Sequence, residues 1–161
     1  MGCLHEGIEH RDVPLRAERV EQHRAGIVTA LLDDPTHSTE RAKKGRREIL
    51  QALATELTVH ETIEEQVLYP AVRSKAEELE DTVLEALEEH HVTKLSLTEL
   101  EKLAPAAERF DAKMTVLIES VRHHVEEEEQ DWFPEVRKGL GRKRLQELGD
   151  ELEKAKIDAP R

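Results

Sequence analysis

Four long stretches of this chain carry apolar residues at the spacing of an amphipathic α-helix. The pattern predicts helices over about residues 15–32, 38–69, 74–103 and 111–134, with short connections between them. Long amphipathic helices joined in this way pack antiparallel to their neighbours in the chain. The sequence therefore predicts an all-α, up-down-up-down four-helix bundle.

Proline and capping residues set the expected ends of these helices. Pro70 is predicted to end or kink the second helix, and Pro134 to interrupt the fourth. The run Ser74-Lys75-Ala76-Glu77 matches a capping box at the start of the third helix. Asp111 is the expected N-cap of the fourth helix.

The ends of the chain differ from its middle. Residues 1–13 are polar and unpatterned, and we expect a tail that is mobile or lies on the surface. Gly139 and Gly141 are expected to act as helix stops, and three leucines beyond them predict a short fifth helix over about residues 142–156. With the bundle over about residues 15–138, a single domain is expected.

The composition agrees with a helical protein and disfavours some classes of binding partner. The 161 residues are 37% apolar and 37% charged, with a net charge of −12. The acidic balance disfavours nucleic acid and anionic membrane as partners. Cys3 is the single cysteine, which fits a reducing compartment, and neither a signal peptide nor a membrane span is apparent. These observations predict a cytoplasmic protein.

One motif occurs twice. In each copy a His is followed by Glu four residues later, by an aromatic residue nine later and by Pro ten later. The copies are His60–Pro70 and His124–Pro134, and they start 64 residues apart. Side chains four residues apart lie on one face of a helix, so an imidazole and a carboxylate at this spacing can bind the same ion or ion pair. Because the motif occurs twice, the sequence strongly indicates an ion-binding site.

The motif residues fall on the faces expected to be buried. Apolar residues precede both His residues by seven and three positions: Leu53, Leu57, Leu117 and Val121. Glu64 and Glu128 extend the same stripes by one turn, where a core would ordinarily have an apolar residue. A buried carboxylate is costly without a compensating positive charge, which favours a metal ion. The remaining motif carboxylates are expected to face solvent: Glu61, Glu65, Glu126, Glu127 and Glu129.

The same test selects among the other histidines. His90 follows Val83 and Leu87 at the apolar offsets, so it is favoured over His91, and His124 is favoured over His123 for the same reason. His23 lies on the apolar face of the first helix, and its support comes from symmetry between the halves of the chain. Each half has one lone His and one His/Glu pair. Lys94, four residues after His90, is expected to extend to solvent or to lie beyond the site.

Six donors from four helices are thus expected to converge. They are His23, His60, Glu64, His90, His124 and Glu128. Four imidazoles and two carboxylates exceed the needs of one tetrahedral zinc ion. They suit two first-row ions with both carboxylates bridging, and the N/O donors without thiolate favour iron or manganese. Water, an oxo or hydroxo group, or an incoming ligand would take the remaining positions.

With these residues the sequence resembles the hemerythrin-like (HHE cation-binding) family, and most closely its stand-alone actinobacterial, mycobacterial-type members. The resemblance covers about residues 15–136 and rests on the two His/Glu motifs, His23 and Glu89-His90. It implies a four-helix bundle with two non-heme iron ions, oxo- or hydroxo-bridged, which Mn or Zn can replace. The oxygen-carrying members have His where this chain has Lys94, and Asp in the last motif where it has Glu128-Glu129. Simple reversible oxygen carriage is therefore not implied.

Four functions from different classes follow. The first is a di-iron protein that binds O₂, peroxide or nitric oxide as a sensor or scavenger, for example in oxidative stress. The second is an enzyme resembling a catalase or peroxidase. The third, a ferritin-like iron oxidase or store, would need two Glu-x-x-His motifs, and Glu88-Glu89-His90-His91 offers one, on the less favoured His91. The fourth is a helical interaction module with incidental histidines.

Overall fold

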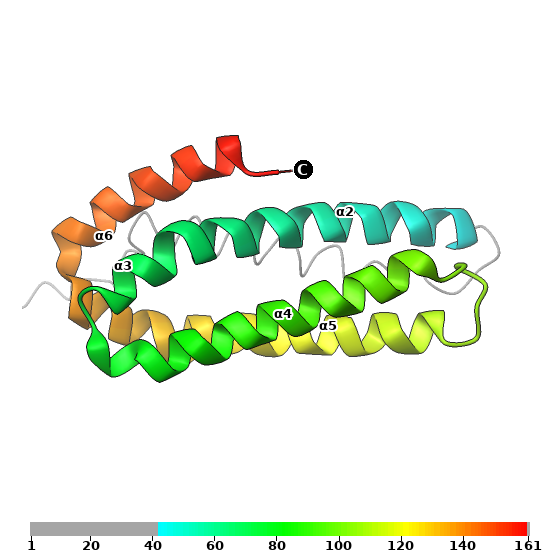
Figure 1. Cartoon of the computed structure of the whole chain (residues 1–161), viewed down its shortest axis with the longest axis horizontal. Coiled ribbons are helices and arrows are strands. Elements are labelled where there is room, and N and C mark those ends of the chain that lie inside the picture. The colour runs from blue at the N-terminus through cyan, green and yellow to red at the C-terminus, as the bar shows by residue number, and fades with distance from the viewer. Residues whose placement is uncertain (1–41, 161) are drawn as a thin grey trace, which may run out of the picture.

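The computed structural model describes residues 42–160, and all regular structure within that range is helical (Figure 1). Three long helices lie side by side along the molecule: α2 (Ala42–Ile63), α4 (Glu80–Lys102) and α5 (Phe110–Glu127). They correspond to the second, third and fourth predicted helices, and consecutive ones run antiparallel. The expected tail, the first helix and His23 lie outside the described residues.

Neither motif proline ends its helix, so of the two outcomes predicted for Pro70 an ended helix is wrong, and the chain also stays helical through Pro134. After α2 the chain continues through a π-helical turn, η2 (Glu64–Leu68), into α3 (Tyr69–Arg73). After α5 it continues through a second π-helical turn, η4 (Glu128–Trp132), into α6 (Phe133–Asp158). Each proline occupies the first turn of the following helix, where its missing N–H costs little.

The π turns have the same backbone hydrogen bond. The N–H of Tyr69 donates to the carbonyl of Glu64, and the N–H of Phe133 donates to the carbonyl of Glu128. Both bonds span five residues, as in a π-helix, rather than the four of an α-helix. The wider turn lets the helix pass the proline that follows, so the motif glutamates begin a turn of unusual geometry.

The predicted caps of α4 and α5 are wrong. Ser74 does not cap a helix; its hydroxyl donates to the carbonyl of Ala71 at 2.8 Å. A short 3₁₀ turn, η3 (Glu77–Leu79), precedes α4, whose N-cap is Leu79 and has no side-chain cap bond. The N-cap of α5 is Arg109, and Asp111 lies in its first turn. There Asp111 Oδ2 accepts from an Arg46 Nη at 3.1 Å, so a contact with α2 takes the place of the cap.

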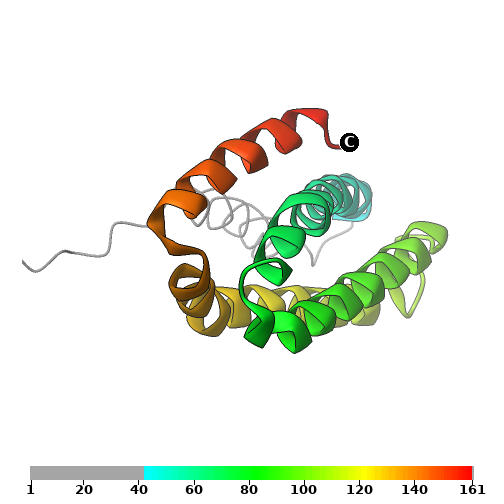
Figure 2. The same ribbon diagram turned by 60° about the vertical axis from the view of Figure 1, so that its left-hand side comes forward.

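The C-terminal helix is bent at a glycine. Gly141 has φ 71° and ψ 161°, a conformation that residues with a Cβ rarely adopt, and the chain is helical again from there to Asp158. The predicted helix over residues 142–156 is confirmed as this second arm. The arm folds back along α2, on the side away from α4 and α5 (Figure 2). A Cβ on Gly139 would lie 2.8 Å from that of Ala76, so the first arm packs closely on the α3–η3 connection.

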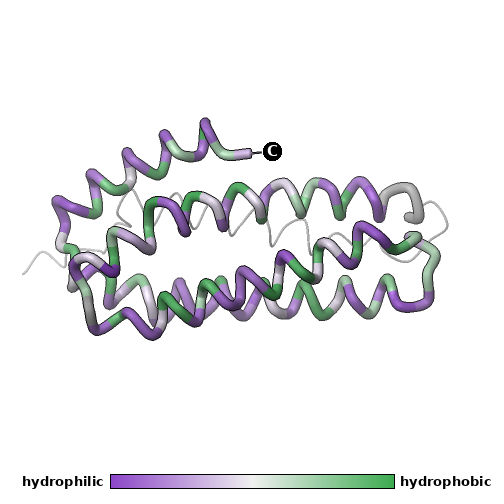
Figure 3. Tube along the Cα trace, viewed as in Figure 1, coloured by the Kyte–Doolittle hydropathy of each residue, from purple (hydrophilic) through white to green (hydrophobic). Residues whose placement is uncertain are grey.

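Apolar and polar residues alternate along the helices (Figure 3). The buried apolar residues form two clusters. One gathers the end of α2, η2, α3, η3, the start of α4, the end of η4 and α6 around Tyr69 and Trp132. The other gathers the rest of α2 and α4 with α5 around Leu53 and Leu117. The buried polar side chains of the motifs lie on the segments between these clusters, so the bundle has a polar layer enclosed by two apolar ones.

Candidate metal centre

Four buried side chains from α2, η2, α4 and α5 bring their donor atoms together. His60, Glu64, His90 and His124 each offer a nitrogen or oxygen atom, and these atoms lie within 4.8 Å of one another. Glu64 Oε2 is 3.2 Å from His60 Nε2 and 3.3 Å from His90 Nε2. The Nε2 atoms of His90 and His124 are 3.2 Å apart. All four residues are at most 6% exposed.

Two further groups border this cluster. Glu128 is 6% exposed, and its Oε1 lies 3.7 Å from His124 Nε2. Tyr69 is 2% exposed, and its hydroxyl lies 3.3 Å from Glu64 Oε2, 3.3 Å from His90 Nε2 and 3.4 Å from Glu128 Oε1. The Tyr69 hydroxyl therefore connects the glutamates of the two motif copies.

A carboxylate binds the outer nitrogen of each of two histidines. His90 Nδ1 lies 3.1 Å from Glu65 Oε1, and His124 Nδ1 lies 2.7 Å from Glu89 Oε2. Such carboxylate–histidine pairs orient the ring and strengthen the opposite nitrogen as a metal ligand. Lys94 in turn donates to Glu65 Oε1 at 2.6 Å, which holds that carboxylate against His90.

These pairs test whether the donor set fits a cation. Because the Nδ1 atoms of His90 and His124 face carboxylates, the proton of each neutral ring is assigned to Nδ1. Both Nε2 lone pairs then point into a space where the two nitrogens are 3.2 Å apart and Glu64 is 0% exposed. Lone pairs and a carboxylate at such distances repel without a positive charge between them. The donor set fits a metal ion.

The electrostatics of the site favour a neutral His90 ring and charged outer carboxylates. Burial lowers the pKa of His90, against the opposing effect of Glu61 and Glu65, so its ring is neutral at pH 7. The hydrogen bond from His124 lowers the pKa of Glu89, although burial opposes it. Burial alone would raise the pKa of Glu65, but hydrogen bonds from Lys94 and His90 outweigh it and lower that pKa.

His90 and His124 are buried, as the apolar offsets predict. His91 and His123 are exposed, as are Glu126, Glu127 and Glu129. Glu88 is exposed with His91, so the Glu-x-x-His motif of the ferritin-like alternative does not reach the buried cluster.

The prediction for Glu61 is wrong. Its side chain is 2% exposed, and Lys94 Nζ lies 3.7 Å from its Oε2. Burial raises the pKa of Glu61 to about 7, although attraction of its carboxylate to the protonated form of His90 and to Lys94 opposes the rise. The prediction failed because it assumed one buried stripe on α2, whereas packing against α4 buries a wider arc. Glu65, also expected in solvent, is half-buried for the same reason.

Tyr69 was missed as a site residue because the prediction used the α-helical repeat. Residues five apart on an α-helix point about 140° away from each other. In the π turn, whose hydrogen bonds join residues five apart, Tyr69 comes into line with Glu64 and its hydroxyl reaches the carboxylate. A proline ten residues after the His, within a continuous amphipathic pattern, was the available signal.

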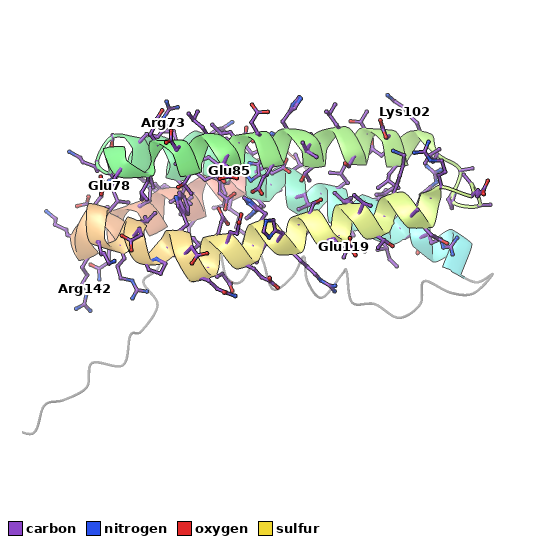
Figure 4. All side chains as sticks on the ribbon, turned by 90° about the horizontal axis from the view of Figure 1, so that it is seen from below. Arg73, Glu78, Glu85, Lys102, Glu119 and Arg142 are labelled. Atoms are coloured by element: carbon purple, nitrogen blue, oxygen red, sulfur yellow. The ribbon has the colours of Figure 1, made fainter. Side chains whose placement is uncertain are left out.

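A pocket of about 190 Å³ between α4 and the α5–η4–α6 segment reaches the centre. His124 and Glu128 form part of its wall, beside Trp132. The other carboxylates lining it are Glu85, Glu89, Glu127, Asp131 and Glu135. Figure 4 looks onto the side of the molecule where α4 and α5 lie next to each other, with Glu85 labelled. The pocket gives small molecules a path to the second motif copy.

Residues 15–136 match the Hemerythrin HHE cation binding domain, and the chain belongs to this family. The family match confirms the expected helical-bundle class. The buried His/Glu cluster thus lies in a domain type defined by cation binding.

A DNA nickase from Nostoc sp. (strain PCC 7120 / SAG 25.82 / UTEX 2576) is 32% identical to this chain over 101 residues, which is 63% of this chain. The matched region is 28% of that relative, so the chain corresponds to little more than a quarter of it. No solved structure matches this chain. Within residues 42–160, no helix has both the length and the hydropathy that crossing a membrane requires.

Proposed function

We propose that this protein binds two non-heme iron ions and uses them to bind O₂, peroxide or nitric oxide, as a sensor or scavenger. The observation that carries the proposal is the convergence of His60, Glu64, His90 and His124 in a buried layer, with the Nε2 atoms of His90 and His124 3.2 Å apart. Glu128 borders these donors, and His23, outside the described residues, is the proposed sixth ligand.

Iron is preferred to zinc because the proposed set has six nitrogen and oxygen donors and no thiolate. Bound iron would supply reversible one-electron chemistry and positions for a small ligand. The protein residues orient the donors: Glu65 holds His90 and Glu89 holds His124 through their Nδ1 atoms. The apolar clusters on either side of the layer limit the access of water to it.

The pocket beside His124 supports the proposed ligand class. Its carboxylate-rich wall disfavours anions, whereas neutral O₂, hydrogen peroxide and nitric oxide pass without an electrostatic penalty. DNA nicking, the activity in the name of the Nostoc relative, receives no such support, because a net charge of −12 opposes binding to a phosphate backbone.

Anaerobic addition of ferrous iron to the metal-free protein tests the proposal. We expect two iron ions per chain that resist a ferrous chelator, and new ligand-to-metal absorption after exposure to air, peroxide or nitric oxide. Protein that retains no iron, with a spectrum unchanged by all three ligands, would contradict it and favour the interaction module.

A catalase- or peroxidase-like activity is the second candidate, and the Tyr69 hydroxyl favours it. Decomposition of peroxide requires protons to move between oxygen atoms, and a buried hydroxyl between Glu64 and Glu128 can hold or deliver one. We expect O₂ release from hydrogen peroxide to fall in Tyr69→Phe at unchanged iron content. A wild-type rate no faster than that of free iron excludes this candidate.

A further inference from the structure

A second group of side chains that could hold a metal ion lies at the surface, next to the buried centre. Glu89 of α4 and His123 and Glu127 of α5 each offer a ligand atom, and these atoms lie within 4.8 Å of one another. The side chains of His123 and Glu127 are 65% and 48% exposed, and His123 Nε2 is 3.3 Å from Glu127 Oε1. We call Glu89, His123 and Glu127 the outer triad.

The outer triad is connected to the buried centre through Glu89. The Oε2 atom of Glu89 lies 2.7 Å from His124 Nδ1, and His124 Nε2 belongs to the buried cluster. His123 and His124 are adjacent in the chain, but His123 is exposed and belongs to the outer triad, whereas His124 is 6% exposed and belongs to the buried cluster. One carboxylate therefore serves an exposed site and a buried one.

The acidic pocket supplies a path between them. Glu89 and Glu127 of the outer triad line it together with His124 and Glu128 of the centre. Its remaining acidic residues are Glu85, Asp131 and Glu135, the last of which pairs with Lys138. No lysine or arginine belongs to the described lining of the pocket. A hollow lined by charges of one sign concentrates ions of the opposite sign and raises their rate of association.

We infer that the outer triad is a capture site for a divalent cation, which then passes along the acidic pocket to the buried centre. One imidazole and two carboxylates, with the rest of the coordination left to water, suit weak binding of Fe²⁺ or Mn²⁺ that can be released inward. The inference rests on the proposed metal centre, but it concerns the rate of loading rather than the amount bound.

Loading kinetics test the route in the full-length, metal-free protein. Fe²⁺ is added anaerobically, and a ferrous chelator in excess stops uptake at set times, so that only buried iron escapes it. We expect His123→Ala and Glu127→Gln to load about tenfold more slowly than wild type and to reach the same final iron count. Raised salt should slow wild type more than the variants.

His91→Ala and Glu126→Gln are the matched controls, because both residues are exposed and lie outside the outer triad and the pocket. They should load at the wild-type rate. Wild-type kinetics in His123→Ala and Glu127→Gln, or an equal slowing in the controls, would overturn the capture site while leaving the buried centre intact. If wild type itself holds no chelator-resistant iron, the proposed function fails, and the inference fails with it.

Binding to the outer triad can also be measured directly. In protein whose centre is filled with diamagnetic Zn²⁺ and freed of excess metal, added Mn²⁺ should broaden the amide resonances of Glu89, His123 and Glu127 selectively. His123→Ala should abolish that selectivity. Broadening spread evenly over the acidic surface, or none at all, would contradict a defined site.

Discussion

The two copies of the His/Glu motif share a backbone but differ in their side chains. In both, the glutamate begins a π-helical turn, its carbonyl accepts from the N–H of an aromatic residue, and proline follows. The first copy has Tyr69 where the second has Phe133. Only the first aromatic residue therefore brings a hydroxyl to the site.

The surroundings of the copies differ as well. Glu64 is 0% exposed and lies among three buried donors, whereas Glu128 is 6% exposed and lines the acidic pocket. After its His the first copy has the buried Glu61, and the second has the half-buried Val125. The two copies therefore share a helix geometry but have different roles. The first copy forms the deep part of the centre, and the second lines the pocket that leads to it.

Replacing the glutamate of each motif copy should produce the largest difference in iron affinity between the two copies. We expect Glu64→Ala to weaken iron binding by more than about 100-fold, beyond the range typical of outer residues that only support ligands. Glu128→Ala should weaken it less, because Glu128 lies at the edge of the donor cluster. Iron titration measures both, with exposed Glu129→Ala as the control. Equal losses in the two variants would show that the copies are equivalent.

Glu61 offers a pH-dependent test in the metal-free protein. Its pKa is raised from 4.5 to about 7 by burial, so ionisation favours the unfolded state as pH rises through that interval. The rise corresponds to roughly 3 kcal/mol. We expect Glu61→Gln to match wild type in free energy of unfolding near pH 4, to exceed it increasingly up to pH 7, and to keep about that advantage above. Denaturant unfolding at several pH values measures the difference; a constant difference contradicts the assigned burial effect.

Much of this molecule was predictable from spacing alone. Apolar periodicity located α2, α4 and α5, and the offsets of three and seven residues selected His90 over His91 and His124 over His123. These predictions hold because they depend on which face of a regular helix is buried. They need no knowledge of the neighbouring helix.

The failures arise where geometry is irregular or set by a neighbour. Pro70 was expected to end or kink its helix and Pro134 to interrupt its own, because the α-helical rule does not include a π turn that accommodates proline. Tyr69 was missed for the same reason. Burial of Glu61 and the supporting role of Glu65 depend on Lys94 of the adjacent helix. Spacing within one helix cannot specify such contacts.

Glu89 and Glu65, the carboxylates that hold histidine rings, should contribute to iron affinity by different amounts. Glu89→Gln and Glu65→Gln are each expected to weaken iron binding by about 10- to 100-fold, because each removes the partner of a histidine Nδ1 atom. Glu89→Gln should have the larger effect, since its contact with His124 is 2.7 Å against 3.1 Å for Glu65 and His90. Competition with a chelator of known affinity measures both at equilibrium. The reverse order would contradict the ranking by contact distance.

Exchange of the aromatic residues should have the smallest effect. Tyr69→Phe makes the first copy resemble the second, and we expect the free energy of unfolding to change by no more than about 1.5 kcal/mol, since one shared hydrogen-bonding group is lost. The absorption spectrum of the iron-loaded protein should nevertheless shift. Phe133→Tyr, which places a hydroxyl in the second copy, is the reciprocal variant. A Tyr69→Phe spectrum identical to wild type would show that the hydroxyl does not influence the centre.

Iron K-edge X-ray absorption of the anaerobically loaded protein tests the central claim most directly, because it reports the atoms around the metal. We expect a first shell of nitrogen and oxygen atoms without sulfur, clear outer-shell scattering from imidazole rings, and a second iron nearby. The imidazole contribution should decrease in His124→Ala and remain unchanged in His91→Ala. Iron surrounded by oxygen alone, with no imidazole scattering, would contradict a metal centre built by these histidines.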